Sequence, residues 1–221
     1  MVVALLLLFA LLAAIPAAAE QAGAIEGVVT TKARGLPPLR VSFDQKVCGT
    51  QLPDAAIVAD GAGHLANVVV TVTGVKAPRP WREGRVLNER CSFVPRVQVL
   101  APGAAIKTSS RDAVLHTTVV QQLDGRQLFN VALPAPGIEL AKSVGGAGVL
   151  RVGCSTHQWM RAWIVVTDEL AVITGPDGRF RLPDLPPGTY ELRFWHEALK
   201  LAPVSVTVKP GATATVTVEA R

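Results

Sequence analysis

Residues 149–166 read Val149-Leu150-Arg151-Val152-Gly153-Cys154-Ser155-Thr156-His157-Gln158-Trp159-Met160-Arg161-Ala162-Trp163-Ile164-Val165-Val166. Both ends of this segment are rich in β-branched residues, which favour strands. We therefore expect strands at 149–152 and 162–166, joined by a short loop. The loop carries a thiol, an imidazole and a thioether, at Cys154, His157 and Met160. Two rigid strands that fix a short loop are the frame that a preorganised metal site needs.

The donors of this loop form a soft, mixed ligand set that favours copper. The Cys-x-x-His spacing lets one tight turn present both donors, and His116, in a strand expected at 114–120, is well placed to add a fourth ligand. Each residue also has an ordinary alternative: Cys154 and Met160 can be core side chains, and His116 a hydrogen-bonded strand histidine. The predicted site is one copper ion held by His116, Cys154, His157 and Met160.

The cysteine count agrees with an exported protein. Residues 1–19 are continuously apolar and end in Ala17-Ala18-Ala19, a pattern typical of a secretory signal. We expect a periplasmic or otherwise exported protein, bound to a membrane only if this segment stays uncleaved. In an oxidising compartment three cysteines leave one thiol over after one disulfide forms. Cys48 and Cys91 lie in loop-like sequence and are assigned to each other, which leaves Cys154 for a metal.

The rest of the chain predicts an all-β protein. It is 49% hydrophobic but only 5% aromatic, and short valine-rich runs alternate with Gly and Pro turns. No segment after the signal shows helical periodicity with caps. Residues 77–90 are expected to form a loop. The remaining expected strands are 24–30, 57–59, 67–73, 96–100, 104–109, 129–133, 171–174, 179–182, 189–195, 204–208 and 213–218. This pattern favours β-sandwiches.

The region from about Cys91 to Val166 resembles the cupredoxins, in particular those of the amicyanin and methylamine-utilisation type. The resemblance is carried by Cys154-x-x-His157-x-x-Met160, by the valine-rich strand that follows, and by Phe93-Val94-Pro95…Gly103…Asp112…His116 upstream. It implies a Greek-key β-sandwich in which one copper ion cycles between Cu(II) and Cu(I). Cys154 would give the strongest bond, His116 and His157 the equatorial nitrogens, and Met160 the axial contact.

The same resemblance implies that His157, flanked by Trp159, lies near the surface and faces a redox partner. Two departures from the family pattern affect the expected redox potential. Thr117 replaces the asparagine that usually follows the first histidine and braces the copper loop. Gln158 and Trp159 make the tip of the loop bulkier than expected.

A second resemblance covers the C-terminal region. Asp177-Gly178-Arg179-Phe180…Leu185-Pro186-Pro187-Gly188-Thr189-Tyr190 is similar to carboxypeptidase regulatory-like domains, which are small transthyretin-like sandwiches and typically not catalytic. The predicted organisation is a signal peptide at 1–19, a cupredoxin-like copper domain at 20–166 and a regulatory-like domain at 167–221. The strand at 24–30 resembles the opening of the regulatory-like domain, so the copper domain could instead be inserted in it.

The predicted function is one-electron transfer by a single type 1-like copper, with no enzymatic activity and no small-molecule substrate. A net charge of +5 favours an acidic redox partner protein. The alternatives are a copper-holding or delivery protein without electron transfer, and a structural or adhesive module with a vestigial site.

Four histidines in total are too few for a multicopper oxidase or a copper nitrite reductase. Methionine is a poor zinc ligand, no hydrolase triad is present, and the scattered basic residues argue against nucleic acid. His64 is expected in a surface turn, and His196 in a local hydrogen bond.

Overall fold

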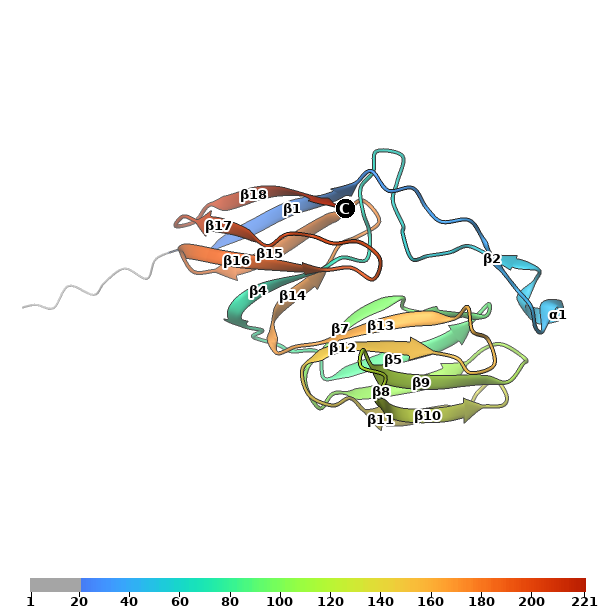
Figure 1. Ribbon diagram of the computed structural model, residues 1–221. Coiled ribbons are helices and arrows are strands. Elements are labelled where there is room, and N and C mark those ends of the chain that lie inside the picture. The colour runs from blue at the N-terminus through green and yellow to red at the C-terminus, as the bar shows by residue number, and fades with distance from the viewer. Residues whose placement is uncertain (1–20) are drawn as a thin grey trace, which may run out of the picture.

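The computed structural model describes residues 21–221, and the predicted signal peptide at 1–19 lies outside them. The described chain folds into two β-sandwiches (Figure 1), which confirms the predicted all-β class. The helix α1 has only four residues, Gln45–Cys48. Within residues 21–221, no helix has the length and apolar character needed to cross a membrane.

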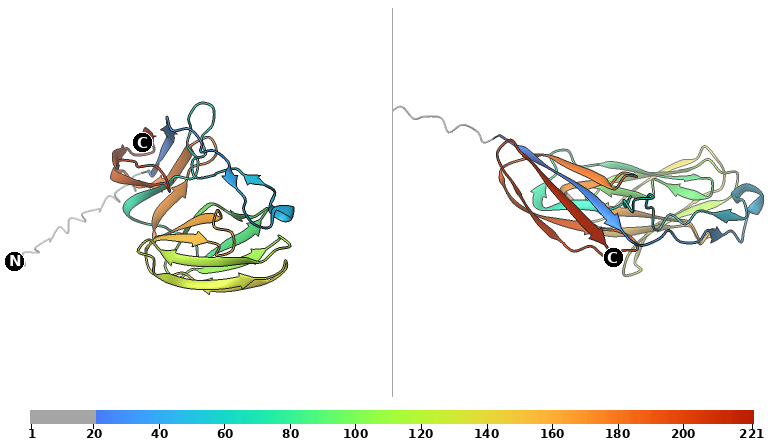
Figure 2. Two further views of the ribbon diagram at one scale, coloured as in Figure 1. Left: turned by 45° about the vertical axis from the view of Figure 1, so that its right-hand side comes forward. Right: turned by 90° about the horizontal axis from the view of Figure 1, so that it is seen from above.

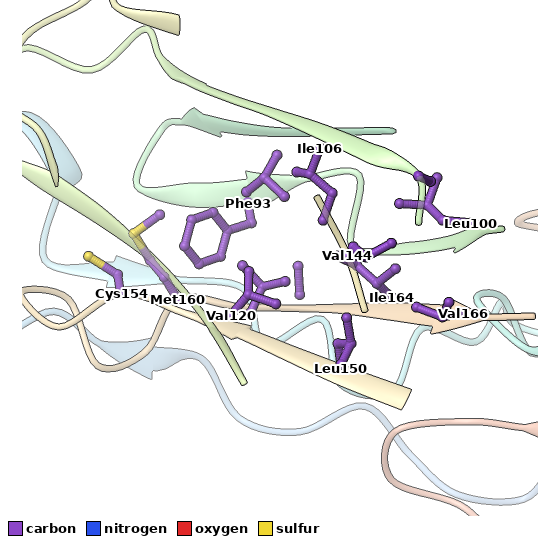
Figure 3. Close-up of a cluster of buried hydrophobic side chains, with 14 residues drawn as sticks. Phe93, Leu100, Ile106, Val120, Val144, Leu150, Cys154, Met160, Ile164 and Val166 are labelled. Carbon is purple, nitrogen blue, oxygen red and sulfur yellow. The ribbon is translucent and has the colours of Figure 1, made fainter. Parts of the chain in front are cut away.

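One sandwich, here called the inserted sandwich, is formed by β5 to β13. Its five-stranded sheet has the order β10 (Gln127–Leu133), β9 (His116–Gln122), β12 (Gly148–Gly153), β13 (Arg161–Val166) and β7 (Val97–Leu100). Its four-stranded sheet has the order β11 (Glu139–Ser143), β8 (Ala105–Ser110), β5 (Glu83–Glu89) and β6 (Ser92–Val94). Alternate side chains of both sheets meet in a core that includes Phe93, Ile106, Val120, Leu150 and Ile164 (Figure 3).

The other sandwich, here called the split sandwich, is built from strands on both sides of the inserted one. Its first sheet has the order β15 (Arg179–Leu185), β1 (Gly23–Thr31) and β18 (Thr213–Ala220). Its second has the order β14 (Glu169–Ile173), β4 (Val69–Lys76), β16 (Gly188–Trp195) and β17 (Val204–Val208). Figure 2 shows β1 and β18 side by side, and they pair in parallel. Ile25, Val70, Leu182 and Leu192 are fully buried in its core.

The structure divides the chain differently from the predicted domains 20–166 and 167–221. β1 and β4 belong to the split sandwich, because each forms backbone hydrogen bonds with strands that follow residue 167. Their buried side chains Ile25 and Val70 fill the core of that sandwich. The inserted sandwich is therefore a continuous segment, residues 83–166, placed between β4 and β14.

Three local predictions need correction. The segment expected to be a loop, 77–90, contains β5, whose Val86 and Leu87 are buried. The strand expected at 57–59 forms only a single bridge, between Ala59 and Leu65. β11 was missed because it is an edge strand with every residue exposed, so its sequence shows no alternation.

Between β1 and β4 the chain forms an arm, defined here as residues 39–52. It contains β2 (Leu39–Arg40), α1 and β3 (Gln51–Leu52), and β2 pairs with β3. The arm leaves the split sandwich and reaches one end of the inserted sandwich (Figure 1). There a disulfide joins Cys48 of the arm to Cys91, which lies between β5 and β6. These are the two cysteines that the sequence assigned to each other.

The two sandwiches meet at an apolar contact with one buried ion pair. Val97, Val165 and Val69 are buried there, and the rings of Trp163 and Trp195 lie 5.5 Å apart between centroids. Arg96 donates hydrogen bonds to both carboxylate oxygens of Glu197, at 2.8 and 2.6 Å, and a third to the backbone oxygen of Arg161, at 2.9 Å. The side chain of Glu197 is only 5% exposed. Such a bidentate pair fixes the relative orientation of the two bodies.

We expect Glu197→Gln to lower the free energy of unfolding by about 2 kcal/mol, since hydrogen bonds to charged groups contribute about 1.5–3 kcal/mol each. The glutamine keeps one acceptor but leaves the buried Arg96 charge without its partner. Denaturant unfolding measures the change. Glu191→Gln breaks the exposed pair with Arg193 and is the matched control, for which we expect less than about 1 kcal/mol. If both variants lose the same unfolding free energy, the buried pair between Arg96 and Glu197 stabilises the protein no more than an exposed ion pair does.

Candidate metal centre

The fold brings the predicted ligands to one end of the inserted sandwich. His116 is the first residue of β9, and Cys154 directly follows β12. β9 and β12 are hydrogen-bonded neighbours, which places these two residues side by side. His157 lies in the turn between β12 and β13, and Met160 directly precedes β13. The strand–loop–strand frame predicted from the sequence therefore carries three of the four residues.

Three donor atoms converge on a space that fits one metal ion. The Nδ1 atoms of His116 and His157 lie 3.0 Å apart, and the Sγ atom of Cys154 lies 4.0 and 3.7 Å from them. A circle through the corners of a triangle with these sides has a radius of about 2.1 Å, close to the bond lengths of about 2.0–2.3 Å at which imidazole and thiolate bind metals such as zinc. Both histidines are fully buried, and Cys154 is 6% exposed.

Met160 lies next to this triangle. Its backbone N–H donates a hydrogen bond to the His157 carbonyl at 2.9 Å, which closes the loop. Its side chain is buried, and Figure 3 shows its sulfur near Cys154 at the end of the core cluster. Both roles considered from the sequence, thioether donor and core side chain, are compatible with this position.

A carboxylate orients each imidazole. The Nε2 atom of His116 lies 3.0 Å from Asp112 Oδ2, and that of His157 lies 3.0 Å from Asp44 Oδ2. A neutral imidazole that donates through Nε2 carries its lone pair on Nδ1, the atom that faces the donor triangle. Carboxylate partners of this kind hold the tautomer and raise the basicity of the ligand.

Asp112 is itself fixed by the backbone. Its two carboxylate oxygens accept hydrogen bonds from the N–H groups of Arg90 and Cys91, both at 2.8 Å. The sequence signal for Asp112 was its place four residues before His116, and it appeared only within the cupredoxin resemblance. Asp44 was missed altogether, because 113 residues separate it from His157. No local spacing could have indicated that contact.

Hydrogen bonds prepare the Cys154 thiol for metal binding. Burial alone would raise its pKa, but hydrogen bonds from the His116 ring, from the backbone N–H groups of Thr117 and His157 and from the Thr117 hydroxyl lower the pKa to about 5. At neutral pH the group is therefore a thiolate, the form that binds metals.

Thr117 braces the loop in place of the expected asparagine. Its backbone N–H and its hydroxyl lie 3.3 and 3.6 Å from Cys154 Sγ. The same hydroxyl accepts a hydrogen bond from the Ser155 N–H at 2.7 Å. A residue of β9 thus still holds the ligand loop at this position, but it does so through a threonine hydroxyl and not through an asparagine amide.

The surface position expected for His157 is wrong. The side chain is fully buried, because the arm lies over it and places Asp44 against its outer nitrogen. Trp159 closes the same side: its ring centroid is 4.9 Å from that of His157, and its indole N–H donates to the Cys91 carbonyl at 3.2 Å. The Cys48–Cys91 disulfide ties the arm in this place.

The other two histidines lie away from the centre. His64 contacts Asp60 at 2.7 Å on the surface. His196 is buried, and its Nδ1 accepts hydrogen bonds from the N–H groups of Ala198 and Leu199, at 3.3 and 3.2 Å. Burial lowers the pKa of His196. The donor atoms of Cys91, Asp112 and His116 also lie close together, but Cys91 is in the disulfide and cannot bind a metal.

Comparisons with known proteins find one family model and several solved structures that are similar to parts of the chain. Residues 161–221 match the model of the carboxypeptidase regulatory-like domain. A purple cupredoxin from Nitrosopumilus maritimus is 18% identical with a TM-score of 0.34, covering 38% of this chain and 99% of that one. Amicyanin from Paracoccus versutus is 17% identical with a TM-score of 0.34, covering 44% and 97%. A Cu-containing nitrite reductase from Thermus scotoductus is 23% identical with a TM-score of 0.35, covering 53% of this chain but only 27% of that one. No curated protein matches the chain.

We expect Asp112→Asn to weaken copper binding by about 10–100-fold, the usual effect of losing a carboxylate that orients a ligand. An asparagine amide can present its N–H₂ group to His116 and so favour the wrong tautomer. Competition titration against a copper chelator measures the affinity. Asp60→Asn changes the carboxylate beside His64 and is the matched control. An unchanged affinity for Asp112→Asn would contradict this role.

Proposed function

We propose that the protein is an exported electron carrier with one type 1-like copper ion, held by His116, Cys154, His157 and Met160. The observation that carries the proposal is the triangle of two Nδ1 atoms and one Sγ atom, which has the size and chemistry of a single thiolate–imidazole metal site. Bound copper would supply a one-electron couple there. In this proposal the protein acts without a substrate reaction, and it exchanges electrons with a partner protein.

The surrounding residues are suited to electron exchange without rearrangement. The ligands stand on or beside strands β9, β12 and β13, so the backbone fixes their positions. Asp112 and Asp44 hold both rings, and Thr117 holds the thiolate. Because His116, His157 and Cys154 are buried, water has little access. A centre with little to reorganise is suited to fast electron transfer.

Reconstitution with Cu(II) tests the proposal. We expect one equivalent to bind and to give an intense visible thiolate-to-copper band, with an EPR spectrum of one Cu(II) species. Chemical reduction should bleach the band, and reoxidation should restore it over repeated cycles. A folded protein that binds no copper would refute the proposal and leave the structural or adhesive function.

A second candidate function, holding or delivery of copper without electron transfer, is favoured by one observation. The arm seals the His157 side and would slow release of the metal, as a storage site requires. In that case the protein would bind Cu(I) tightly but remain colourless, and it would not complete redox cycles with Cu(II). The same reconstitution therefore separates the two functions.

A further inference from the structure

A hollow of about 410 Å³ lies beside the ligand loop, and none of its lining residues belongs to the arm. Cys154 and Met160 are among its lining residues, together with Arg151, Arg161 and Gln121. It lies on the outer face of the five-stranded sheet, where β9, β12 and β13 end near the loop. Cys154 and Met160 border the hollow as residues, although their side chains are buried in the core. The hollow therefore lies directly beside the ligand loop, whereas the arm covers His157.

A glycine leaves the floor of this hollow open. Gly153 pairs with Val119 of β9 on one side and with Arg161 of β13 on the other. A Cβ atom built on Gly153 would meet no heavy atom within 4 Å. Any other residue at this position would project its side chain into the hollow, directly before Cys154.

The hollow is positively charged. Arg151 and Arg161 are exposed on adjacent strands, and no acidic residue lines the hollow. In the described part of the chain neither guanidinium takes part in an ion pair. With its amide oxygen turned toward Arg151, Gln121 accepts hydrogen bonds at 3.0 and 2.6 Å, so Arg151 is held in place. Two unpaired guanidinium groups around a depression favour carboxylates or other anions.

We propose that this hollow is the docking point of an acidic redox partner protein, whose carboxylates pair with Arg151 and Arg161. One electron would pass between the partner and the metal centre past Cys154: the partner is oxidised as the centre is reduced, and no bond or proton is exchanged. The choice of partner follows from the charge complementarity and from the closure of the His157 side by the arm. This inference rests on the proposed function.

Anion binding is tested on the metal-free protein, and so independently of copper. Hexacyanocobaltate(III), an inert trivalent anion, is titrated into ¹⁵N-labelled protein. We expect saturable shifts of the Ser155 and Gln158 amides, and loss of these shifts in the double variant Arg151→Gln/Arg161→Gln. Lys142→Gln/Lys209→Gln removes the same net charge elsewhere and should keep them. Shifts centred on the exposed apolar residues of the arm, Phe43 and Val47, would overturn the proposal.

Electron exchange is tested on the copper-loaded protein by stopped flow. Hexacyanoferrate(II) gives one electron to the oxidised centre, and we expect Arg151→Gln/Arg161→Gln to slow this reaction about tenfold at low salt, the lower range of electrostatic steering. The cationic reductant hexaammineruthenium(II) should not be slowed. Gly153→Leu, which fills the hollow without changing charge, should slow hexacyanoferrate(II) too.

The outcomes separate the two proposals. An equal decrease in the Lys142→Gln/Lys209→Gln control would mean that only net charge matters and would overturn the docking site. Absence of a copper band in the unmodified protein would instead refute the proposed function, while the anion titration would still report on the hollow.

Discussion

Cys154→Ser is expected to abolish the visible thiolate-to-copper band completely. The band requires a copper–sulfur bond, and Cys154 is the only cysteine outside the disulfide. Serine keeps an acceptor near the N–H groups of Thr117 and His157, which now lie 3.3 and 3.4 Å from the sulfur. The fold should therefore persist, since these buried donors are not left without a partner. Visible absorption after Cu(II) addition measures the effect.

Two further variants make this result specific. His116→Ala should also lose the band, because it removes one corner of the donor triangle. His196→Ala, which removes a buried histidine outside the centre, should keep the band. Circular dichroism of each metal-free variant checks that the sandwich is folded. A band that survives in Cys154→Ser would falsify the ligand assignment.

The double variant Cys48→Ala/Cys91→Ala is expected to lose about 4 kcal/mol of unfolding free energy, from the chain-entropy relation for a loop of this size. The two cysteines are separated by 43 residues. Alanine is preferred to serine because both sites are buried, where a hydroxyl would need a partner. Denaturant unfolding of the metal-free protein measures the loss, and dithiothreitol should reproduce it in the unmodified chain.

The same variant should also weaken copper binding by about 10–100-fold, because it frees the arm that holds Asp44 against His157. Asp44→Asn is the matched comparison: it should weaken binding similarly while leaving most of the unfolding free energy. If the double variant loses stability but binds copper normally, the arm is a structural clamp only, and Asp44 does not support the centre.

The convergence of the candidate ligands could be predicted from the sequence where the signals are local. Cys154, His157 and Met160 lie within seven residues, and the valine-rich strands on both sides indicated a rigid frame. The pairing of Cys48 with Cys91 followed from the count of three cysteines and from the loop-like sequence around these two. These features depend on spacing and composition, which can be read from one chain.

Features that depend on distant contacts were not predicted. Asp44 reaches His157 through a fold in which the arm leaves one sandwich and is tied to the other, and no spacing indicates this. The expected exposure of His157 came from the family resemblance, which covers about Cys91 to Val166 and therefore does not include the arm. β5 was missed because the prolines and the tryptophan that precede it suggested a continuous loop. Membership of β1 in the split sandwich agrees with the alternative in which the strand at 24–30 opens the regulatory-like domain. Membership of β4 was not predicted, because it depends on pairing with the distant strands β14 and β16.

The parallel pairing of β1 with β18 determines the order in which the chain can fold. Thr30 and Val218, which lie on these strands, are 188 residues apart, so this pairing has to close almost the whole described chain, and loop closure over such lengths is slow. The inserted sandwich, residues 83–166, has all its strands in one continuous segment and can form first. We therefore expect the inserted sandwich to acquire structure early, and the split sandwich to form last, when its N-terminal and C-terminal strands pair.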